Sequence, residues 1–103
     1  MVIDMKTIAN TYMMRIADAK EVETKYDLIQ DLRAEITEFE VMNDMRFMRS
    51  TYSRTNTREN HIETYEMIFF SDMFSLLIKK DYNNNGELID CAVMEYYNED
   101  EVY

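Results

Sequence analysis

The chain has 103 residues, 47% of them hydrophobic, and it carries a formal net charge of −10 at pH 7. This hydrophobic share predicts one folded domain with a single core and excludes a disordered chain. The excess of acid repels nucleic acid and anionic membranes and favours basic partners, while a single Cys excludes an internal disulfide.

Residues 1–49 are predicted to be helical because apolar side chains recur at spacings of three and four. No Gly or Pro interrupts them, so one long helix and two helices with a bend near residues 19–21 both remain open. The pattern forms two stripes: Met5, Ile8, Tyr12, Ile16 and Ala19, and then Val22, Ile29, Leu32, Ile36 and Phe39, with Tyr26 beside the second.

Residues 50–60 are predicted to be an Arg-rich loop, because they are rich in Ser, Thr, Asn and Arg and lack aliphatic side chains. The aromatic and β-branched content of residues 62–78 favours strands, although the spacing of their apolar residues also fits a helix. A hairpin needs a third strand for independent stability. This supports the strand interpretation and places a turn at Ser71-Asp72.

Residues 81–92, DYNNNGELIDCA, hold the only Gly of a chain without Pro. They match the first half of a calcium-binding loop, but Ala92 stands where such a loop needs a bidentate Glu. Asn85-Gly86 between two apolar runs is a strong hairpin signal, because both residues tolerate positive φ. We therefore expect a β-hairpin and no calcium site.

The register of this hairpin stays open between two turns. A two-residue turn at residues 85–86 places Asp81 opposite Asp90, which is unfavourable because like charges meet. A four-residue turn over residues 83–86 removes that repulsion and pairs Lys79 with Asp90 instead.

The predicted fold class is α+β: one or two N-terminal amphipathic helices followed by a small antiparallel sheet of two or three strands. A single domain is expected over the whole chain, with a helical part (1–49), an Arg-rich loop (50–60), a β part (61–98) and a tail (99–103). The tail is acidic and is expected to fray.

No pattern in the chain predicts catalysis, a metal site or a cofactor. One Gly cannot build a phosphate-binding loop. His61 is interpreted as a solvated residue at a loop edge, with no recognisable nucleophile motif nearby. His61 and Cys91 are too far apart in sequence to form a zinc-ligand pattern, and Cys91 is interpreted as a small core residue.

The most informative pattern is a row of acids in the second helical stretch, at spacings of four, four, four and three. At 100° per residue these acids span a sector of about 120°, opposite the apolar stripe. They form either an ordinary solvated face or a row of negative charge that copies a phosphate backbone and docks on a basic nucleic-acid-binding surface. The row consists of Glu23, Asp27, Asp31, Glu35 and Glu38.

A basic island separates two acidic blocks, because the net charge is −5 over residues 1–45, +3 over 46–61 and −8 over 62–103. Arg with aromatics is typical of nucleic-acid contact, but pairing with the acidic blocks or contact with a partner also fits. Since the rest of the chain repels nucleic acid, direct binding is not expected. The island comprises Arg46, Arg49, Arg54, Arg58 and Tyr52, and Tyr96 and Tyr97 offer a further aromatic contact.

These observations predict a non-catalytic protein that inhibits a larger nucleic-acid-binding protein by occupying its basic surface. In composition the chain resembles phage-encoded inhibitors of host defence, such as anti-CRISPR and anti-restriction proteins. A dimeric adaptor module or antitoxin is the alternative, and a nucleic-acid binder that uses the Arg island is the second. No apolar run reaches the length of a membrane span and no basic apolar leader is present. We therefore expect a cytoplasmic protein without membrane association.

Overall fold

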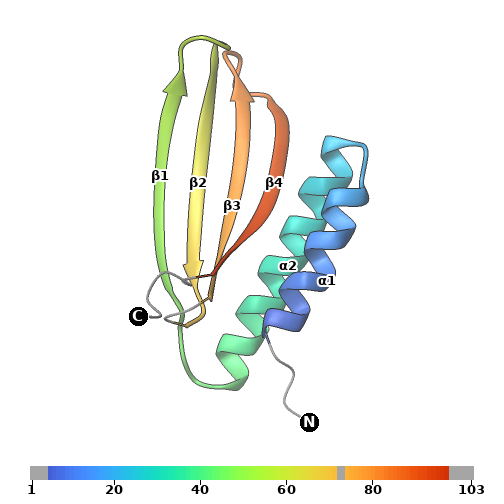
Figure 1. Cartoon of the computed structure of the whole chain (residues 1–103), viewed down its shortest axis with the longest axis vertical. Coiled ribbons are helices and arrows are strands. Elements are labelled where there is room, and N and C mark those ends of the chain that lie inside the picture. The colour runs from blue at the N-terminus through green and yellow to red at the C-terminus, as the bar shows by residue number, and fades with distance from the viewer. Residues whose placement is uncertain (1–4, 72–73, 98–103) are drawn as a thin grey trace. The chain divides into compact units, whose positions relative to one another are not determined.

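A computed structural model of the chain describes residues 5–71 and 74–97. Two helices are followed by a four-stranded antiparallel sheet (Figure 1). This confirms the α+β class, but the sheet has four strands where two or three were predicted. The chain divides into a helical unit, which ends at Phe47, and a sheet unit, which begins at Met48. No helix within the described ranges is long and apolar enough to cross a membrane.

The helical unit contains two helices rather than one, α1 (Met5–Asp18) and α2 (Val22–Met42). The backbone N–H of Ala19 closes the last turn of α1 on the carbonyls of Arg15 and Ile16, at 3.0 and 3.3 Å. Glu21 then adopts an extended conformation as the N-cap of α2, with φ −101° and ψ 139°. The break therefore lies at the predicted bend, although neither Gly nor Pro marks it.

The helices pack side by side and antiparallel (Figure 1). Both predicted apolar stripes contribute buried side chains, two from the first stripe and three from the second. Their remaining members, including the aromatic Tyr12 and Phe39, are half-buried, as is Tyr26 beside the second stripe. The buried side chains of the two helices are Met5, Ala9, Ile16, Ile29, Leu32, Ile36 and Glu40.

The end of α2 is fixed by backbone and side-chain hydrogen bonds together. Asp44 adopts a left-handed conformation, with φ 49°, and the N–H of Met45 bonds back to the carbonyl of Glu40 at 3.0 Å. This is the bond pattern that closes many helices. The buried carboxylate of Glu40 accepts the N–H of Phe47 at 2.8 Å, and the Phe47 ring stacks on Phe39 at 5.8 Å.

The sheet unit is a meander in which each strand pairs with the next in antiparallel fashion. Its strands are β1 (Met48–Asn56), β2 (His61–Phe69), β3 (Phe74–Asn83) and β4 (Leu88–Tyr97). The strand interpretation of residues 62–78 is confirmed. The turn predicted at Ser71-Asp72 lies partly outside the described residues, and the tail predicted for residues 99–103 lies wholly outside them.

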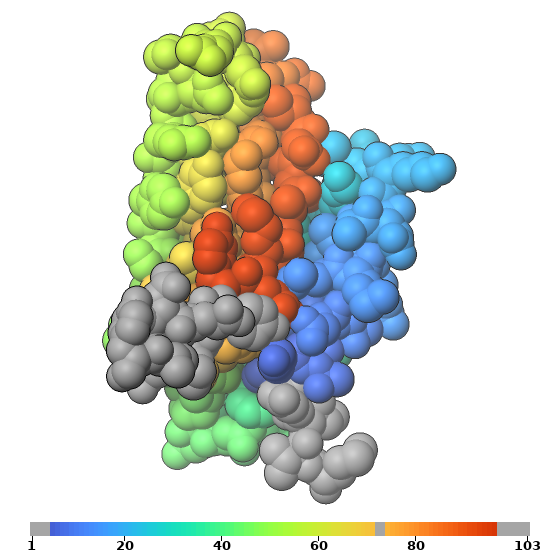
Figure 2. All heavy atoms as spheres, viewed as in Figure 1, coloured from blue at the N-terminus to red at the C-terminus, as the bar shows by residue number. Residues whose placement is uncertain are grey.

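The loop predicted for residues 50–60 is wrong, because β1 extends through Asn56 and only residues 57–60 form a turn. Every residue of β1 pairs with β2. The strand is nevertheless exposed along most of its length, and Figure 2 shows its side chains, in light green, at the free edge of the sheet. An edge strand obtains its hydrogen bonds from its neighbour, so it needs no aliphatic side chains to form.

The two faces of the sheet differ in chemistry, because residues paired across antiparallel strands lie on the same face. One face is apolar and largely buried in its central rows. It includes Cys91, which confirms the interpretation of this residue as part of the core. The buried members of this face are Ile68, Phe74, Leu76, Ile78, Cys91 and Val93.

The hairpin predicted around residues 81–92 is confirmed between β3 and β4. Its turn spans three residues, 84–86, since the N–H of Asn83 bonds to the carbonyl of Glu87 at 2.9 Å. Gly86 supplies the required left-handed conformation, with φ +81°. The Asn83 side-chain oxygen accepts the N–H groups of Asn85 and Glu87 at 2.9 and 3.0 Å, which holds the turn in shape.

The like-charge register, in which Asp81 lies opposite Asp90, is the one that occurs. The alternative pairing of Lys79 with Asp90 is wrong, because Lys79 lies opposite Ala92. A bulge next to Asp81 absorbs the odd residue of the turn. Turn chemistry and the burial of the apolar face thus decide the register against charge repulsion.

Substitution of Gly86 by Ala should destabilise the protein by about 1 kcal/mol, because a residue with a Cβ is strained at positive φ. No atom lies within 4 Å of an added Cβ, so a steric clash would contribute nothing. Urea unfolding measures the effect. Gly86→Asn should cost less, since Asn tolerates this conformation, and the exposed Asn84→Ala serves as the control. Equal stability of Gly86→Ala and the original would contradict this account of the turn.

Candidate functional site

The row of acids predicted in the second helix lies on the exposed side of α2. Four of its members are exposed and Glu35 is half-buried. The opposite side of the helix carries the buried Ile29, Leu32 and Ile36. We call this row the acidic face, and it consists of Glu23, Asp27, Asp31, Glu35 and Glu38.

No carboxylate of the acidic face is neutralised within the helical unit. Across residues 5–47, no ion pair or side-chain hydrogen bond reaches these five groups. The two bases of α2, Lys25 and Arg33, lie about 80° outside the acidic sector at 100° per residue. The acids therefore form an uninterrupted row.

The negative charge of the acidic face acts on the neighbouring helix. Burial raises the pKa of the Tyr12 hydroxyl in α1, and the charges of Glu35 and Asp31 raise it further. Arg15 opposes this shift, with its guanidinium carbon 5.6 Å from the centre of the Tyr12 ring. The effect of the two acids on Tyr12 exceeds that of the nearby cation, so the local field is negative.

The four Arg of the basic island do not share one surface. Arg46 is an exposed residue of the helical unit and Arg58 lies in the exposed β1–β2 turn. Arg49 and Arg54 are five positions apart on β1, so their side chains lie on opposite faces of the sheet. Arg54 is held internally by Glu63. Internal pairing, one of the interpretations left open by the sequence, therefore applies to Arg54.

The predicted aromatic contacts lie on strands. Tyr52 is exposed and stacks on Tyr65, with ring centres 4.7 Å apart and planes at 11°. Tyr96 is exposed on β4. Tyr97 also belongs to β4, but its side chain lies outside the described part of the chain. Tyr52 and Tyr96 are thus presented by the sheet.

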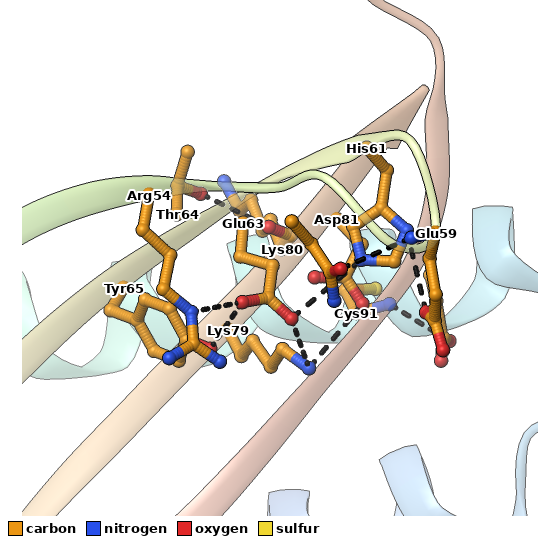
Figure 3. A network of polar contacts seen from close by, with 12 residues as sticks. Arg54, Glu59, His61, Glu63, Thr64, Tyr65, Lys79, Lys80, Asp81 and Cys91 are labelled. Atoms are coloured by element: carbon orange, nitrogen blue, oxygen red, sulfur yellow. Dashed lines mark hydrogen bonds and ion pairs between the residues drawn. The ribbon is translucent and has the colours of Figure 1, made fainter. Parts of the chain in front are cut away.

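The polar face of the sheet contains a cluster that the sequence did not predict (Figure 3). Strand pairing aligns Arg54, Glu63, Asp81 and Asp90 in one row across the four strands. The adjacent rows contribute Lys79 and Tyr65 on one side and His61 on the other. Glu59, in the β1–β2 turn, lies beside His61. We use the name polar cluster for the residues joined by these side-chain contacts, which are Arg54, Glu59, His61, Glu63, Tyr65, Lys79 and Asp81.

Glu63 is the centre of the polar cluster. Its Oε1 accepts hydrogen bonds from the Arg54 Nε at 2.5 Å and from the Tyr65 hydroxyl at 3.1 Å. Its Oε2 lies 3.4 Å from the Lys79 ammonium. The Arg54 hydrogen bond is the main cause that lowers the pKa of Glu63 to about 2, although burial acts against it. Glu63 is therefore ionised throughout the neutral range.

Lys79 connects Glu63 to the neighbouring carboxylate of Asp81. Its ammonium lies 3.5 Å from the Asp81 Oδ2. Burial alone would lower the pKa of Lys79, but the charges of Asp81 and Glu63 together raise it above its ordinary value. Lys79 therefore stays protonated and offsets part of the negative charge of this row.

The interpretation of His61 as a solvated residue is wrong, since only 8% of its surface is exposed. His61 is the first residue of β2 and lies on the same face as Glu63, two positions later. Its Nε2 is 3.6 Å from the Glu63 Oε2, and its Nδ1 is 3.6 Å from a carboxylate oxygen of Glu59. The alternation His61-x-Glu63-x-Tyr65, which begins one residue before the stretch predicted as strands, is the sequence signal that could have indicated this grouping.

Comparison with known proteins adds no relative: no protein-family model, curated protein or solved structure matches the chain. The acidic face and the polar cluster therefore have to be interpreted from their own geometry and charge. The two differ in one respect that matters for function. Glu63 and Asp81 of the polar cluster each have the Lys79 ammonium within 4 Å, whereas the acidic face has no cation this close within the helical unit.

Replacement of Glu63 by Gln should reduce the acid sensitivity of the protein. Because the pKa of Glu63 is lowered from 4.5 to about 2, its ionised form contributes stability that is fully present above about pH 4.5. This contribution is lost as the pH falls towards 2. Urea unfolding of both proteins between these pH values should show a smaller pH dependence for Glu63→Gln, which should also be less stable at pH 7.

The control for this comparison is Glu87→Gln, because Glu87 is exposed in the β3–β4 hairpin and lies outside the polar cluster. This variant should keep the acid sensitivity of the original protein. If Glu63→Gln and the original lose stability in parallel over this window, the ion pair with Arg54 is not the source of the pH dependence.

Proposed function

We propose that this protein is a non-catalytic inhibitor that uses the acidic face of α2 to occupy the basic, nucleic-acid-binding surface of a larger protein. The observation that carries the proposal is an unneutralised row of five acids, four of them exposed, opposite the buried stripe of the same helix. From Glu23 to Glu38 the row extends roughly 22 Å at 1.5 Å per residue.

The energetics of the acidic face favour a binding role. Like charges at i,i+4 destabilise a helix by a few tenths of a kcal/mol per pair, and no base is interleaved to relieve this cost. A basic partner surface removes the repulsion and gains attraction at every position of the row. Such complementarity also accelerates association and discriminates against acidic proteins.

The regular spacing of the row supports nucleic-acid mimicry over a general attraction to basic proteins. Acids at i,i+4 are separated by about 6 Å along a rigid helix, so they present evenly spaced charges, as a phosphate backbone does. A channel lined with Lys and Arg would accept this row in place of its nucleic acid. The resemblance in composition to phage-encoded anti-CRISPR and anti-restriction inhibitors supports the same kind of target.

Direct nucleic-acid binding is the weaker alternative. Arg49 and Arg54 lie on opposite faces of β1, and Arg54 is held by Glu63. No single surface of the sheet unit therefore combines the Arg residues of the island. The net charge of −10 adds repulsion of any nucleic acid.

Reversal of two charges on the acidic face tests the proposal. Asp27→Lys with Asp31→Lys changes two exposed residues and leaves the buried stripe intact. The variant should fold with equal or slightly higher stability, because like-charge repulsion is relieved. It should lose a partner that the original captures from a lysate, and the original should compete with the nucleic acid of that partner. Capture should weaken between about 0.1 M and about 1 M salt, as screening increases.

The matched control is Asp18→Lys with Glu87→Lys, which produces the same change in net charge at exposed positions outside the acidic face. This control should retain the partner. Equal loss of binding in both variants would show that only net charge matters. A partner that holds its nucleic acid and this protein at the same time would exclude mimicry.

A further inference from the structure

We propose that His61, Glu63 and Asp81 form a binding site for one divalent transition-metal ion, with Zn²⁺ as the representative ion. One potential ligand atom from each of the three residues lies within 4.8 Å of the others. All three residues are buried, with 4 to 9% of their surface exposed. This inference goes beyond the proposed function, because the polar cluster belongs to the sheet unit and the acidic face to α2.

Two buried polar atoms of these three residues have unsatisfied hydrogen-bonding capacity. The Nε2 of His61 and the Oδ1 of Asp81 are both inaccessible, and neither has a hydrogen-bond partner among the described residues. Buried polar atoms are normally paired, because an unpaired one loses its hydration without compensation. The His61 Nε2 is directed towards the Glu63 Oε2, 3.6 Å away (Figure 3). A metal ion bound at this position would give a partner to both unpaired atoms, the His61 Nε2 and the Asp81 Oδ1.

The surrounding residues are placed to orient the ligands. A His ligand commonly donates the N–H of its second nitrogen to a carboxylate, and the Glu59 carboxylate lies 3.6 Å from the His61 Nδ1. Arg54 and Tyr65 both bond the Oε1 of Glu63, which leaves its Oε2 for the ion. The site therefore has outer partners for two of its three ligands.

The donor set selects the class of ion. One imidazole nitrogen with two carboxylate oxygens suits Zn²⁺ and similar transition ions, whereas Ca²⁺ and Mg²⁺ prefer oxygen ligands alone. Bonds of about 2.1 Å require ligand atoms about 3.4 Å apart in a tetrahedral site. The observed separations of up to 4.8 Å can close by side-chain rotation, because β2 and β3 already place Glu63 opposite Asp81.

Lys79 competes with the ion for this position. Its ammonium lies 3.4 Å from the Glu63 Oε2 and 3.5 Å from the Asp81 Oδ2. A dication would repel it, so Lys79 has to turn away when the ion binds. Its side chain is 28% exposed, which leaves a route to solvent. Metal affinity should therefore increase when this competing charge is removed.

Titration of the full chain with Zn²⁺ at pH 7 tests the site by calorimetry and by NMR of the imidazole. His61 is the only His of the chain, so its ring signals report on this site alone. We expect one equivalent of Zn²⁺ to bind and the His61 signals to shift in proportion. His61→Ala and Asp81→Asn should each weaken binding by about tenfold or more, and Lys79→Met should strengthen it severalfold.

Glu87→Gln is the control, since it removes one carboxylate of the sheet unit outside the polar cluster, and its affinity should equal that of the original. Circular dichroism establishes that each variant is folded. If His61→Ala does not fold, the His61 signals of the original protein still decide the question. Unchanged His61 signals at saturating Zn²⁺, unchanged affinity in Asp81→Asn, or weaker binding in Lys79→Met would each overturn the proposal.

Discussion

The antiparallel register of β2 with β3 is the constraint on which the sheet unit depends. It places Ile68 opposite Leu76 and Glu63 opposite Asp81, so one face is apolar and the other carries the charged row. Side chains alternate between faces with a period of two, and a slip of one residue would exchange the two sets. The burial of Ile68 and Leu76, at 1% and 0% exposure, opposes any such slip.

This register includes one unfavourable electrostatic contact. Asp81 lies opposite Asp90 across β3 and β4, where like charges are unfavourable. Lys79 reduces the cost, because its ammonium lies close to Asp81 and Glu63 on the same face. The turn over residues 84–86 and the buried apolar rows therefore determine the pairing, and the charged side chains adjust to it.

The acids of the two units differ in whether a base is paired with them. In the sheet unit, Glu63 is held by Arg54, Tyr65 and Lys79, and its pKa is lowered accordingly. In α2, four of the five acids of the acidic face are exposed and Glu35 is half-buried, and no base of the helical unit reaches them. Paired acids contribute to the fold of the sheet, whereas the acids of α2 remain available to a partner. This contrast is why the proposed partner surface and the proposed metal site lie in different units.

Features that depend on neighbours in the sequence could be predicted from the sequence alone. The two helical stripes, the exposed acidic face and the hairpin at Asn85-Gly86 follow from helical spacing and from turn chemistry, both of which act within a few residues. The core position of Cys91 was predicted from the general behaviour of that residue type.

Features that depend on distant residues were decided by the tertiary structure. Strand β1 forms because β2 supplies its hydrogen bonds. The polar sequence of β1 does not indicate that such a neighbour exists. His61 and Glu63 lie on β2, and strand pairing brings the distant Asp81 of β3 beside them. The position of His61 at the edge of the predicted loop indicated a solvated residue, whereas the register of the sheet makes it a member of the polar cluster.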